Sequence, residues 1–307
     1  MHHTRIKRVR AANPSPMTLD GTNTYLIGAG NGSAIVIDPG PPIPEHIDAI
    51  CAEAAVDEWT IGAIAVTHGH PDHAPGARLL AARTNAPVYA HAEARFPHDR
   101  ELADGERLVL GDAALLAIHT PGHARDHLVF WYDDERALFT GDVILGAGTV
   151  VIAPPGGDMR QYQATLDRLR RDFSGARRID GGHGESVEDP LAKLDEYIEH
   201  RKNREREIVA VVEEGPATIA AIVERVYHGI SQTLWPAAAR QVLAYLIALE
   251  REGRVRARRL DRAPTPSEAA ILNPDLSRIV DPSSRAVVAA ELGIDRSVTT
   301  IEEYALR

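Results

Sequence analysis

The sequence predicts a layered α/β sandwich followed by a smaller, mainly helical domain. Three observations predict this arrangement. Residues 1–190 alternate short β-type runs with helical stretches, and many short strands with interposed helices are typical of an α/β sandwich. From about residue 191 onward, charged helical segments replace that alternation. The length of 307 residues exceeds one small domain and suits either one large domain or a main domain with an appendage.

Seven apolar runs are the candidate strands of the main domain. Most are rich in β-branched or aromatic residues, and turn-forming residues separate them. The first two are joined by a turn of Gly, Ala and Asn at residues 28–32. The seven runs are 24–27, 33–38, 61–67, 87–90, 114–118, 128–132 and 137–140.

The second part of the chain predicts helices and then a basic strand. Residues 191–212 read as one or two helices rich in Glu, Arg and Lys. Further helices are predicted over 218–227, with Thr at its cap, and over 235–252, with Pro in its first turn. Residues 254–260 alternate like a strand, and together these elements resemble a winged helix. A last helix is predicted over 283–292.

We therefore divide the chain into three parts. Residues 1–205 form the main domain, residues 206–262 form the winged-helix-like domain, and residues 263–307 form an extension whose packing the sequence does not predict. The net charge of −10 is concentrated in the main domain, where residues 1–200 carry 18 Lys/Arg against 29 Asp/Glu. An acidic body disfavours long-range attraction of nucleic acid.

The sequence predicts a protein of a reducing compartment. Cys51 is its single cysteine, which excludes an internal disulfide framework. No apolar run approaches the roughly 20 residues of a membrane helix, and the basic start is followed by no apolar stretch typical of a secretory signal. We expect a cytoplasmic protein with no membrane partner.

The segment that carries most information about chemistry is 67–73, Thr-His-Gly-His-Pro-Asp-His. Three imidazoles and one carboxylate fall within six residues, directly after an apolar strand. Zinc favours His nitrogen and carboxylate oxygen as ligands. Because one loop offers two pairs of ligands, it predicts two ions close together, an arrangement that can activate water and polarise a substrate.

Three later segments repeat this design. His123 follows Pro-Gly, Asp142 follows Thr-Gly, and His183 follows Gly-Gly, each just after a strand-like run. Glycine next to each ligand allows the backbone to approach an ion closely. We expect these three side chains to converge on the 67–73 loop.

The order His-x-His-x-Asp-His, Pro-Gly-His, Gly-Asp, Gly-His-Gly resembles the metallo-β-lactamase superfamily, and in particular its glyoxalase-II-like dinuclear sites. The resemblance implies an αββα sandwich with two divalent ions that share Asp142. The ligands of the first ion would be His68, His70 and His123. The ligands of the second ion would be Asp72, His73 and His183. True antibiotic-hydrolysing zinc lactamases carry cysteine where this chain has Asp142, so β-lactam hydrolysis is not expected.

A narrower resemblance covers residues 5–262. The segment 13–26, Asn-Pro-Ser-Pro-Met-Thr-Leu-Asp-Gly-Thr-Asn-Thr-Tyr-Leu, is similar to the opening of the lactamase-beta-2-like subgroup, which carries a C-terminal winged helix. Some members of that subgroup are single-strand endoribonucleases, and relatives release products from acyl carrier proteins. Residues beyond 263 lie outside the resemblance.

These observations predict a metal-dependent hydrolase in which a metal-bridging hydroxide attacks a thioester, ester or lactone. Its substrate would be a small molecule or a carrier-bound acyl group. Asp72 is the candidate catalytic residue, because it could orient the nucleophile or accept its proton. Zinc is the expected metal, although Mn²⁺ or Fe²⁺ would suit the same ligands. The alternatives are a metal-dependent endoribonuclease acting on single-stranded RNA and a non-catalytic metal- or nucleic-acid-binding protein. Oligomeric state is left open.

Other polar residues are interpreted as structural. We expect His119 to pack at a strand end, Asp126 to be a solvated or capping group, and Cys51 to pack in a helix. His127 could orient a ligand or fill the core. The remaining histidines considered are expected on the surface or on helices: His91, His98 and His200.

The helix at 236–249 offers only Arg240 and Gln241 to a nucleic acid, whereas a recognition helix normally presents several basic and amide groups. We therefore expect the winged helix to pack beside the metal cleft and to shape substrate entry. The arginines of the basic strand could contact phosphates or belong to a solvated wing: Arg254, Arg256, Arg258 and Arg259.

Overall fold

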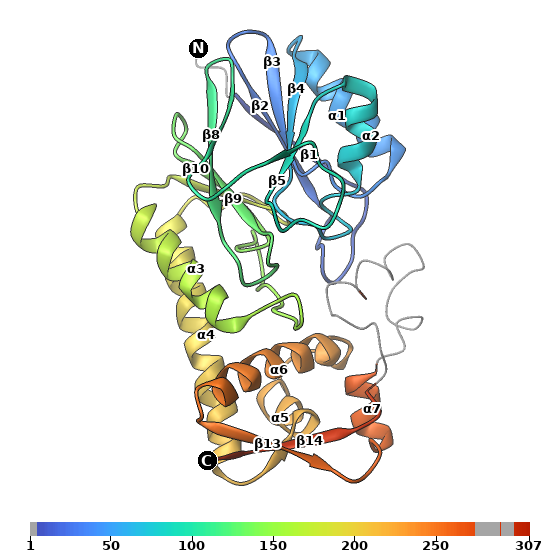
Figure 1. Cartoon of the computed structure of the whole chain (residues 1–307), viewed down its shortest axis with the longest axis vertical. Coiled ribbons are helices and arrows are strands. Elements are labelled where there is room, and N and C mark those ends of the chain that lie inside the picture. Colours follow the sequence, from blue (N-terminus) through green and yellow to red (C-terminus); the bar gives the residue numbers. More distant parts are fainter. Residues whose placement is uncertain (1–4, 274–288, 290–297) are drawn as a thin grey trace.

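Two β-sheets packed face to face form the larger part of the molecule (Figure 1). The computed structural model describes residues 5–273, 289 and 298–307. The first sheet has six strands in the order β1-β2-β3-β4-β5-β6, antiparallel from β1 to β3 and parallel from β3 to β6. Its strands are β1 Ile6–Arg10, β2 Asn23–Gly28, β3 Ser33–Ile37, β4 Thr60–Ala65, β5 Val88–Ala90 and β6 Arg100–Glu101.

The second sheet has five strands in the order β11-β10-β9-β8-β7. It is antiparallel except for the parallel pair β10 and β11. Its strands are β7 Arg107–Leu110, β8 Ala113–His119, β9 Leu128–Tyr132, β10 Ala137–Gly141 and β11 Arg178–Gly181.

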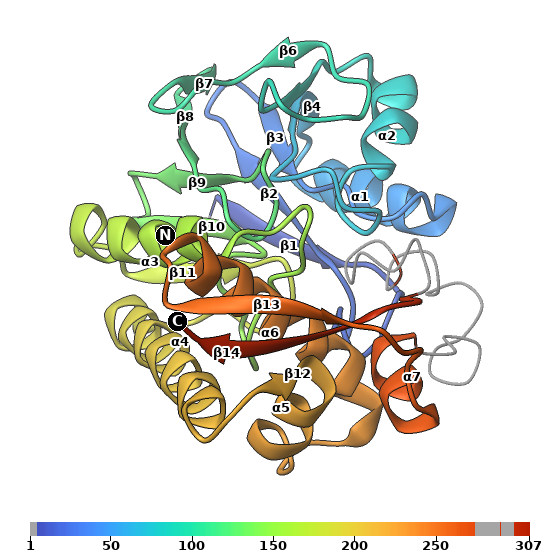
Figure 2. The same cartoon turned by 60° about the horizontal axis from the view of Figure 1, so that its bottom comes forward.

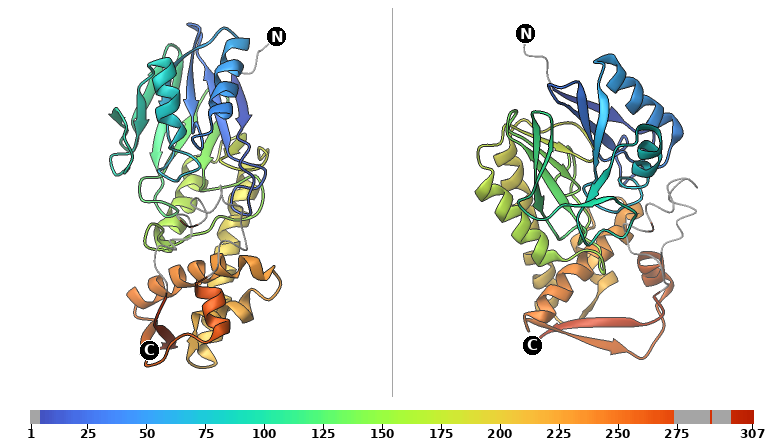
Figure 3. Two further views of the ribbon diagram at one scale, coloured as in Figure 1. Left: turned by 90° about the vertical axis from the view of Figure 1, so that its right-hand side faces the viewer. Right: turned by 45° about the horizontal axis from the view of Figure 1, so that its top comes forward.

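Helices cover the outer faces of both sheets. On the first sheet these are α1 (Pro44–Val56) and α2 (Gly76–Thr84), and on the second sheet α3 (Met159–Asp172) and the first half of α4 (Pro190–Glu213). Figure 3 shows the four layers from two further directions. The predicted αββα sandwich is thereby confirmed.

Side chains in the first sheet alternate between two cores. On β2, Leu26 packs under α1 and α2, whereas Ile27 faces the second sheet. On β3, Val36 likewise packs under α1 and α2, and Ile35 faces the second sheet. Because successive side chains of a strand point to opposite faces and both faces are covered, these strands are buried almost throughout. This double burial fixes the strands and therefore the loops at their ends.

The described part of the C-terminal domain contains three short or medium helices and a small sheet. The helices are α5 (Ile219–Val226), α6 (Trp235–Arg251) and α7 (Pro266–Leu272), with a 3₁₀ turn, η1 (Gln232–Leu234), before α6. Thr218 caps α5 by accepting a hydrogen bond from Ala221 N–H, as predicted. Figure 2 shows the sheet in front, in the order β12-β14-β13. Its strands are β12 Ala217–Thr218, β13 Val255–Leu260 and β14 Ile301–Leu306.

The last strand was not expected from the sequence. β14 comes from the 263–307 extension and lies between β12 and β13, pairing with β13 over its whole length. The extension therefore completes the sheet of the winged-helix domain. The predicted helix 283–292 lies outside the described residues except for Ala289.

The two domains are joined by α4, a single helix of 24 residues. One continuous apolar core runs from the second sheet through α3 and α4 to α5 and α6. The predicted boundary at residue 205 lies within α4, and the division into 1–205, 206–262 and 263–307 stays a prediction. Among the described helices, none combines the length and the apolar character needed to cross a bilayer.

Candidate metal centre

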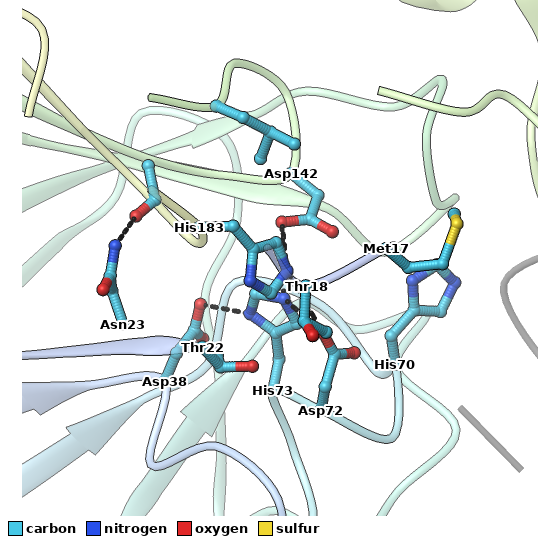
Figure 4. A network of polar contacts seen from close by, with 12 residues as sticks. Met17, Thr18, Thr22, Asn23, Asp38, His70, Asp72, His73, Asp142 and His183 are labelled. Carbon is cyan, nitrogen blue, oxygen red and sulfur yellow. Dashed lines mark hydrogen bonds and ion pairs between the residues drawn. The ribbon is translucent and has the colours of Figure 1, made fainter. Parts of the chain in front are cut away.

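Strand ends from both sheets bring the predicted side chains to one edge of the sandwich. The 67–73 loop follows β4, His123 follows β8, Asp142 follows β10 and His183 follows β11. The parallel pairs β3/β4 and β10/β11 place their carboxyl ends at the same edge. The structure therefore brings all seven predicted residues together, and Figure 4 shows part of the cluster.

The seven side chains form two groups that share one carboxylate. Within each group the candidate ligand atoms lie within 4.8 Å of one another. The first group consists of His68, His70, His123 and Asp142. The second group consists of Asp72, His73, Asp142 and His183. Both sets agree with the two ligand sets that the sequence resemblance implies.

Six inward atoms of these side chains have no hydrogen-bond partner, whereas Nε2 of His123 lies 3.0 Å from Nδ1 of His70. The Nε2 atoms of His68, His73 and His183, both carboxylate oxygens of Asp72 and Oδ1 of Asp142 are buried and unpaired. Leaving so many buried polar atoms unsatisfied is costly. Divalent ions bound by imidazole nitrogen and carboxylate oxygen would satisfy them. The site is thus a potential dinuclear His/Asp metal site.

The opposite ring nitrogens of the histidines are held by the protein. His73 Nδ1 donates to Asp38 Oδ2 at 2.8 Å, and His123 Nδ1 donates to Val151 O at 3.0 Å. His183 Nδ1 donates to Gly21 O at 3.2 Å. When the imidazole is neutral, each bond fixes the tautomer whose unprotonated Nε2 can bind an ion.

Asp38 is a supporting residue that the sequence analysis missed. Its side chain is buried at the end of β3 and accepts from Thr67 N–H and Oγ1–H, both at 2.7 Å, as well as from His73. Thr67 Oγ1 lies 3.0 Å from His68 Nδ1 and can accept its proton. One carboxylate thus orients a histidine in each group. A carboxylate directly after a strand parallel to β4 is the signal that could have indicated it.

The 13–26 segment frames the turn that carries His183. Asn23 N–H donates to Gly182 O at 2.7 Å, and Asn23 Nδ2 donates to Gly181 O and Gly184 O. Tyr25 Oη donates to Gly181 O at 2.8 Å. These bonds, with the one from His183 to Gly21, explain why this segment accompanies the ligand pattern.

Glycine is required at two positions next to candidate ligands, because the surrounding atoms leave no room for a Cβ. A Cβ at Gly182 would lie 2.6 Å from both Asp142 Oδ1 and His73 Cε1. Gly122, next to His123, has φ of +138° and would place a Cβ 2.3 Å from the backbone of Tyr162. Any other residue at these positions would displace the ligands.

The two groups differ in their electrostatics. Although burial lowers the pKa of His73 and His183, Asp72 and Asp142 outweigh it, raising the pKa of His73 well above its ordinary value and that of His183 to about 10. Burial and neighbouring imidazoles lower the pKa of His68 and bring that of His70 to about 3. The imidazoles of the second group therefore hold protons where an ion would bind, whereas the imidazoles of the first group are already neutral.

His127 holds the backbone of Asp142, the residue that both groups share. Its Nε2 accepts from Asp142 N–H at 3.1 Å, so its Nδ1 carries the proton and lies 2.9 Å from Thr120 Oγ1. The ring also stacks on His68, with ring centroids 4.8 Å apart. Of the two roles considered for His127, the structure favours orientation of the site.

The other polar residues that were expected to have structural roles lie outside the two groups. His119 stacks on His91 with centroids 4.0 Å apart at the end of β8, and Cys51 packs on α1 against the apolar core. Asp126 is half-buried and accepts a hydrogen bond from the backbone of Gly69, so it supports the 67–73 loop. His98 is half-buried, whereas His200 lies on α4 and lines a pocket.

That pocket has a volume of about 370 Å³ and lies between the sandwich and the C-terminal domain. His123 and Asp142 of the metal centre line it, together with residues of the sandwich such as Leu145 and Val150. Residues of the C-terminal domain also line the pocket: Tyr227, Ile230, Leu234, Ala237, Ala238 and Gln241. The winged-helix domain therefore does pack beside the metal cleft.

An αββα sandwich with this donor set defines a class, the metal-dependent hydrolases. The chain belongs to the metallo-beta-lactamase superfamily, whose family model matches residues 17–172. A model of the beta-lactamase associated winged helix domain matches residues 218–262.

Relatives and solved structures agree with this assignment. The chain is 34% identical to a beta-lactamase-like protein 2 homolog of Drosophila melanogaster, over 81% of this chain and 89% of that protein. It is 34% identical to an atrochrysone carboxyl ACP thioesterase of Aspergillus chevalieri, over 73% of each chain. A metallo-beta-lactamase family protein of Thermus thermophilus shares the fold, with a TM-score of 0.70 and 22% identity over 83% of this chain and 96% of that chain.

Proposed function

We propose that this hydrolase cleaves a carbonyl substrate, a thioester in the first place and otherwise an ester or lactone, with two divalent ions bound. The observation that carries the proposal is the pocket beside the metal centre. Its volume of about 370 Å³ lies within the range of small-molecule sites. Most of its lining side chains are apolar, and His123 and Asp142 are among the lining residues. Such a pocket suits an acyl group whose carbonyl reaches the ions.

The ligand assignment follows the two groups. We propose that His68, His70 and His123 hold one ion and that Asp142 is shared. Asp72, His73 and His183 would hold the other. Zinc is the proposed metal because imidazole and carboxylate are among its preferred ligands. When bound, such ions lower the pKa of a coordinated water and polarise a substrate carbonyl.

Asp72 is the proposed catalytic residue. Its carboxylate is fully buried, and its Oδ2 lies 3.2 Å from His183 Nε2 and 3.4 Å from His73 Nε2. Burial raises the pKa of Asp72, but His73 and His183 outweigh it and hold the pKa below its ordinary value. The ionised Oδ1 has no hydrogen-bond partner and can accept a proton from the nucleophile.

A carrier-bound acyl group is the preferred form of substrate. One relative of comparable length is named as a thioesterase for an acyl carrier protein. The pocket is lined by both domains, and the 13–26 segment contributes Pro16, Met17 and Leu19 to it. A free small thioester or lactone would fit the same space.

The endoribonuclease alternative has less structural support. In Figure 1 the basic strand β13 lies at the end of the molecule away from the sandwich, with α6 in between. Two of its candidate arginines are paired with acids, Arg254 with Glu205 and Arg258 with Glu303. On α6, Gln241 is buried and bonded to Ile152 N–H, so it is turned toward the sandwich and away from any nucleic acid.

Initial rates of the zinc-loaded protein on an acyl-thioester and on a labelled single-stranded RNA test the proposal, with Asp142→Ala as the matched control. We expect thioester hydrolysis that the control lacks and that changes little with salt. RNA cleavage that the control lacks and that falls steeply with ionic strength would instead make the protein a nuclease. Turnover of neither substrate class, with both ions bound, would favour a binding protein.

A further inference from the structure

We infer that Gln241 and Arg201, from the C-terminal half of the chain, are positioning residues for the candidate metal ligand His123. The connection passes through three consecutive residues, Val150, Val151 and Ile152. These residues lie in the irregular segment between β10 and α3. The inference rests on the two metal groups of the proposed function and adds a role for the winged-helix domain.

The middle residue of the three orients the ligand. His123 Nδ1 donates to Val151 O at 3.0 Å, which turns Nε2 toward the first group. His123 follows β8 in a turn, and a segment without strand pairing supplies its acceptor. The direction of the imidazole therefore depends on what holds this segment in place.

Side chains from α4 and α6 hold the residues on either side. Arg201 Nη2 donates to Val150 O at 2.7 Å, and Ile152 N–H donates to Gln241 Oε1 at 3.1 Å. Arg201 is fully buried and Gln241 is 5% exposed. A hydrogen bond between fully desolvated groups is costly to lose. The carbonyl of Val151 is thus fixed between two buried anchors.

The histidines of the second group are held by different parts of the protein. His73 is held by Asp38, at the end of β3, and His183 is held by Gly21, just before β2. Both supports belong to the sandwich itself. Of the contacts that hold His73, His183 and His123, only that of His123 depends on the C-terminal domain. Loss of the Gln241 hydrogen bond should therefore weaken the first group and leave the second intact.

The test measures zinc affinity, by competition with a chromogenic chelator, in two backgrounds. His183→Ala disables the second group, and His70→Ala disables the first. Adding Gln241→Met removes the acceptor for Ile152 N–H with little change in volume. We expect the affinity of the first group to fall about 10- to 100-fold, the usual effect of losing a group that orients a ligand. The affinity of the second group should change less than about 2-fold.

Three further variants make the result decisive. Gln241→Glu keeps an acceptor and should restore most of the affinity. Thr218→Ala removes the N-cap of α5, elsewhere in the C-terminal domain, so it should destabilise the protein without weakening zinc binding. If Gln241→Met does not fold, Gln241→Asn tests the same bond, because its amide is one methylene too short.

Equal weakening of both groups, or of neither, would overturn the inference. A wild-type protein that binds no zinc would refute the proposed metal site itself, which is a separate outcome. Two bound ions with an unaffected Gln241→Met variant would refute only the positioning role.

Discussion

The two metal groups share Asp142 but differ in charge and access. The second group is completely buried except at Asp142, and it has two carboxylates beside two imidazoles. The first group has three imidazoles, includes the half-buried His70, and meets the pocket through His123. The second group is therefore suited to retaining an ion and the first to meeting the substrate. Four predictions test this division.

The largest effect is expected from Asp142→Ala, because both groups lose a ligand. We expect turnover to fall by more than the roughly 10⁴-fold that one proton-transfer group contributes. Steady-state rates and metal content measure this. Asp180→Asn is the matched control, a buried carboxylate on β11 that bonds to Arg178 and Ser186 outside the site. Retention of both ions and of activity by Asp142→Ala would contradict a shared ligand.

Asp72→Asn separates binding from catalysis. An amide oxygen can still approach an ion but cannot accept a proton, so turnover should fall about 10²- to 10⁴-fold. Rates normalised to bound metal check the prediction. Unchanged turnover at full metal content would exclude a catalytic role and leave Asp72 as a ligand only.

The pH dependence of metal affinity should distinguish the groups. Because the pKa of His73 is raised well above its ordinary value and that of His183 is raised to about 10, both are protonated at neutral pH without metal. Binding must release these protons, so the affinity of the second group should rise with pH between about 6 and 9, by up to about 100-fold per unit for two protons.

The first group should behave differently over the same range. The pKa of His68, His70 and His123 is lowered, to about 3 for His70, so no protons remain to be released. Zinc titrations at several pH values, corrected for the protonation of the competing chelator, compare the groups in the His183→Ala and His70→Ala backgrounds. Parallel slopes for the two groups would show that the electrostatic contrast is wrong.

The smallest effect is expected from Asp38→Asn. The amide removes the negative charge beside His73 and at most part of the hydrogen bonding, so zinc affinity of the second group should fall about 10- to 100-fold. The first group depends on Asp38 only through Thr67 and should lose less. The same competition titration measures both. A larger loss at the first group would mean that Asp38 acts mainly on the loop and only indirectly on His73.

The sequence predicted the parts of the site that lie next to turns in the chain. The candidate ligands His68, His123 and His183 each follow an apolar run, and glycine marks most of the turns, so their convergence could be inferred. Asp38 was missed because its role depends on β3 lying parallel to β4, a pairing that no local pattern states. Gln241 was interpreted only as a weak candidate for nucleic-acid contact, because its partner Ile152 is distant in the chain.

The strands, like the site residues, could be predicted only where the local sequence shows a clear pattern. Buried strands such as β9 were recognised from their apolar and aromatic residues. β1 and β7 were not, because each mixes charged and apolar residues at an edge of its sheet. β14 was missed because its partner β13 precedes it by some forty residues, so only the tertiary structure shows the pairing.

The central claim is that two ions bind at two groups sharing Asp142, and anomalous X-ray diffraction from zinc-grown crystals tests it most directly. We predict two peaks about 3.5 to 4 Å apart, the usual spacing of two-metal sites. One peak should lie among His68, His70 and His123, the other among Asp72, His73 and His183, with Asp142 between them. A single peak, or peaks away from these residues, would contradict the account.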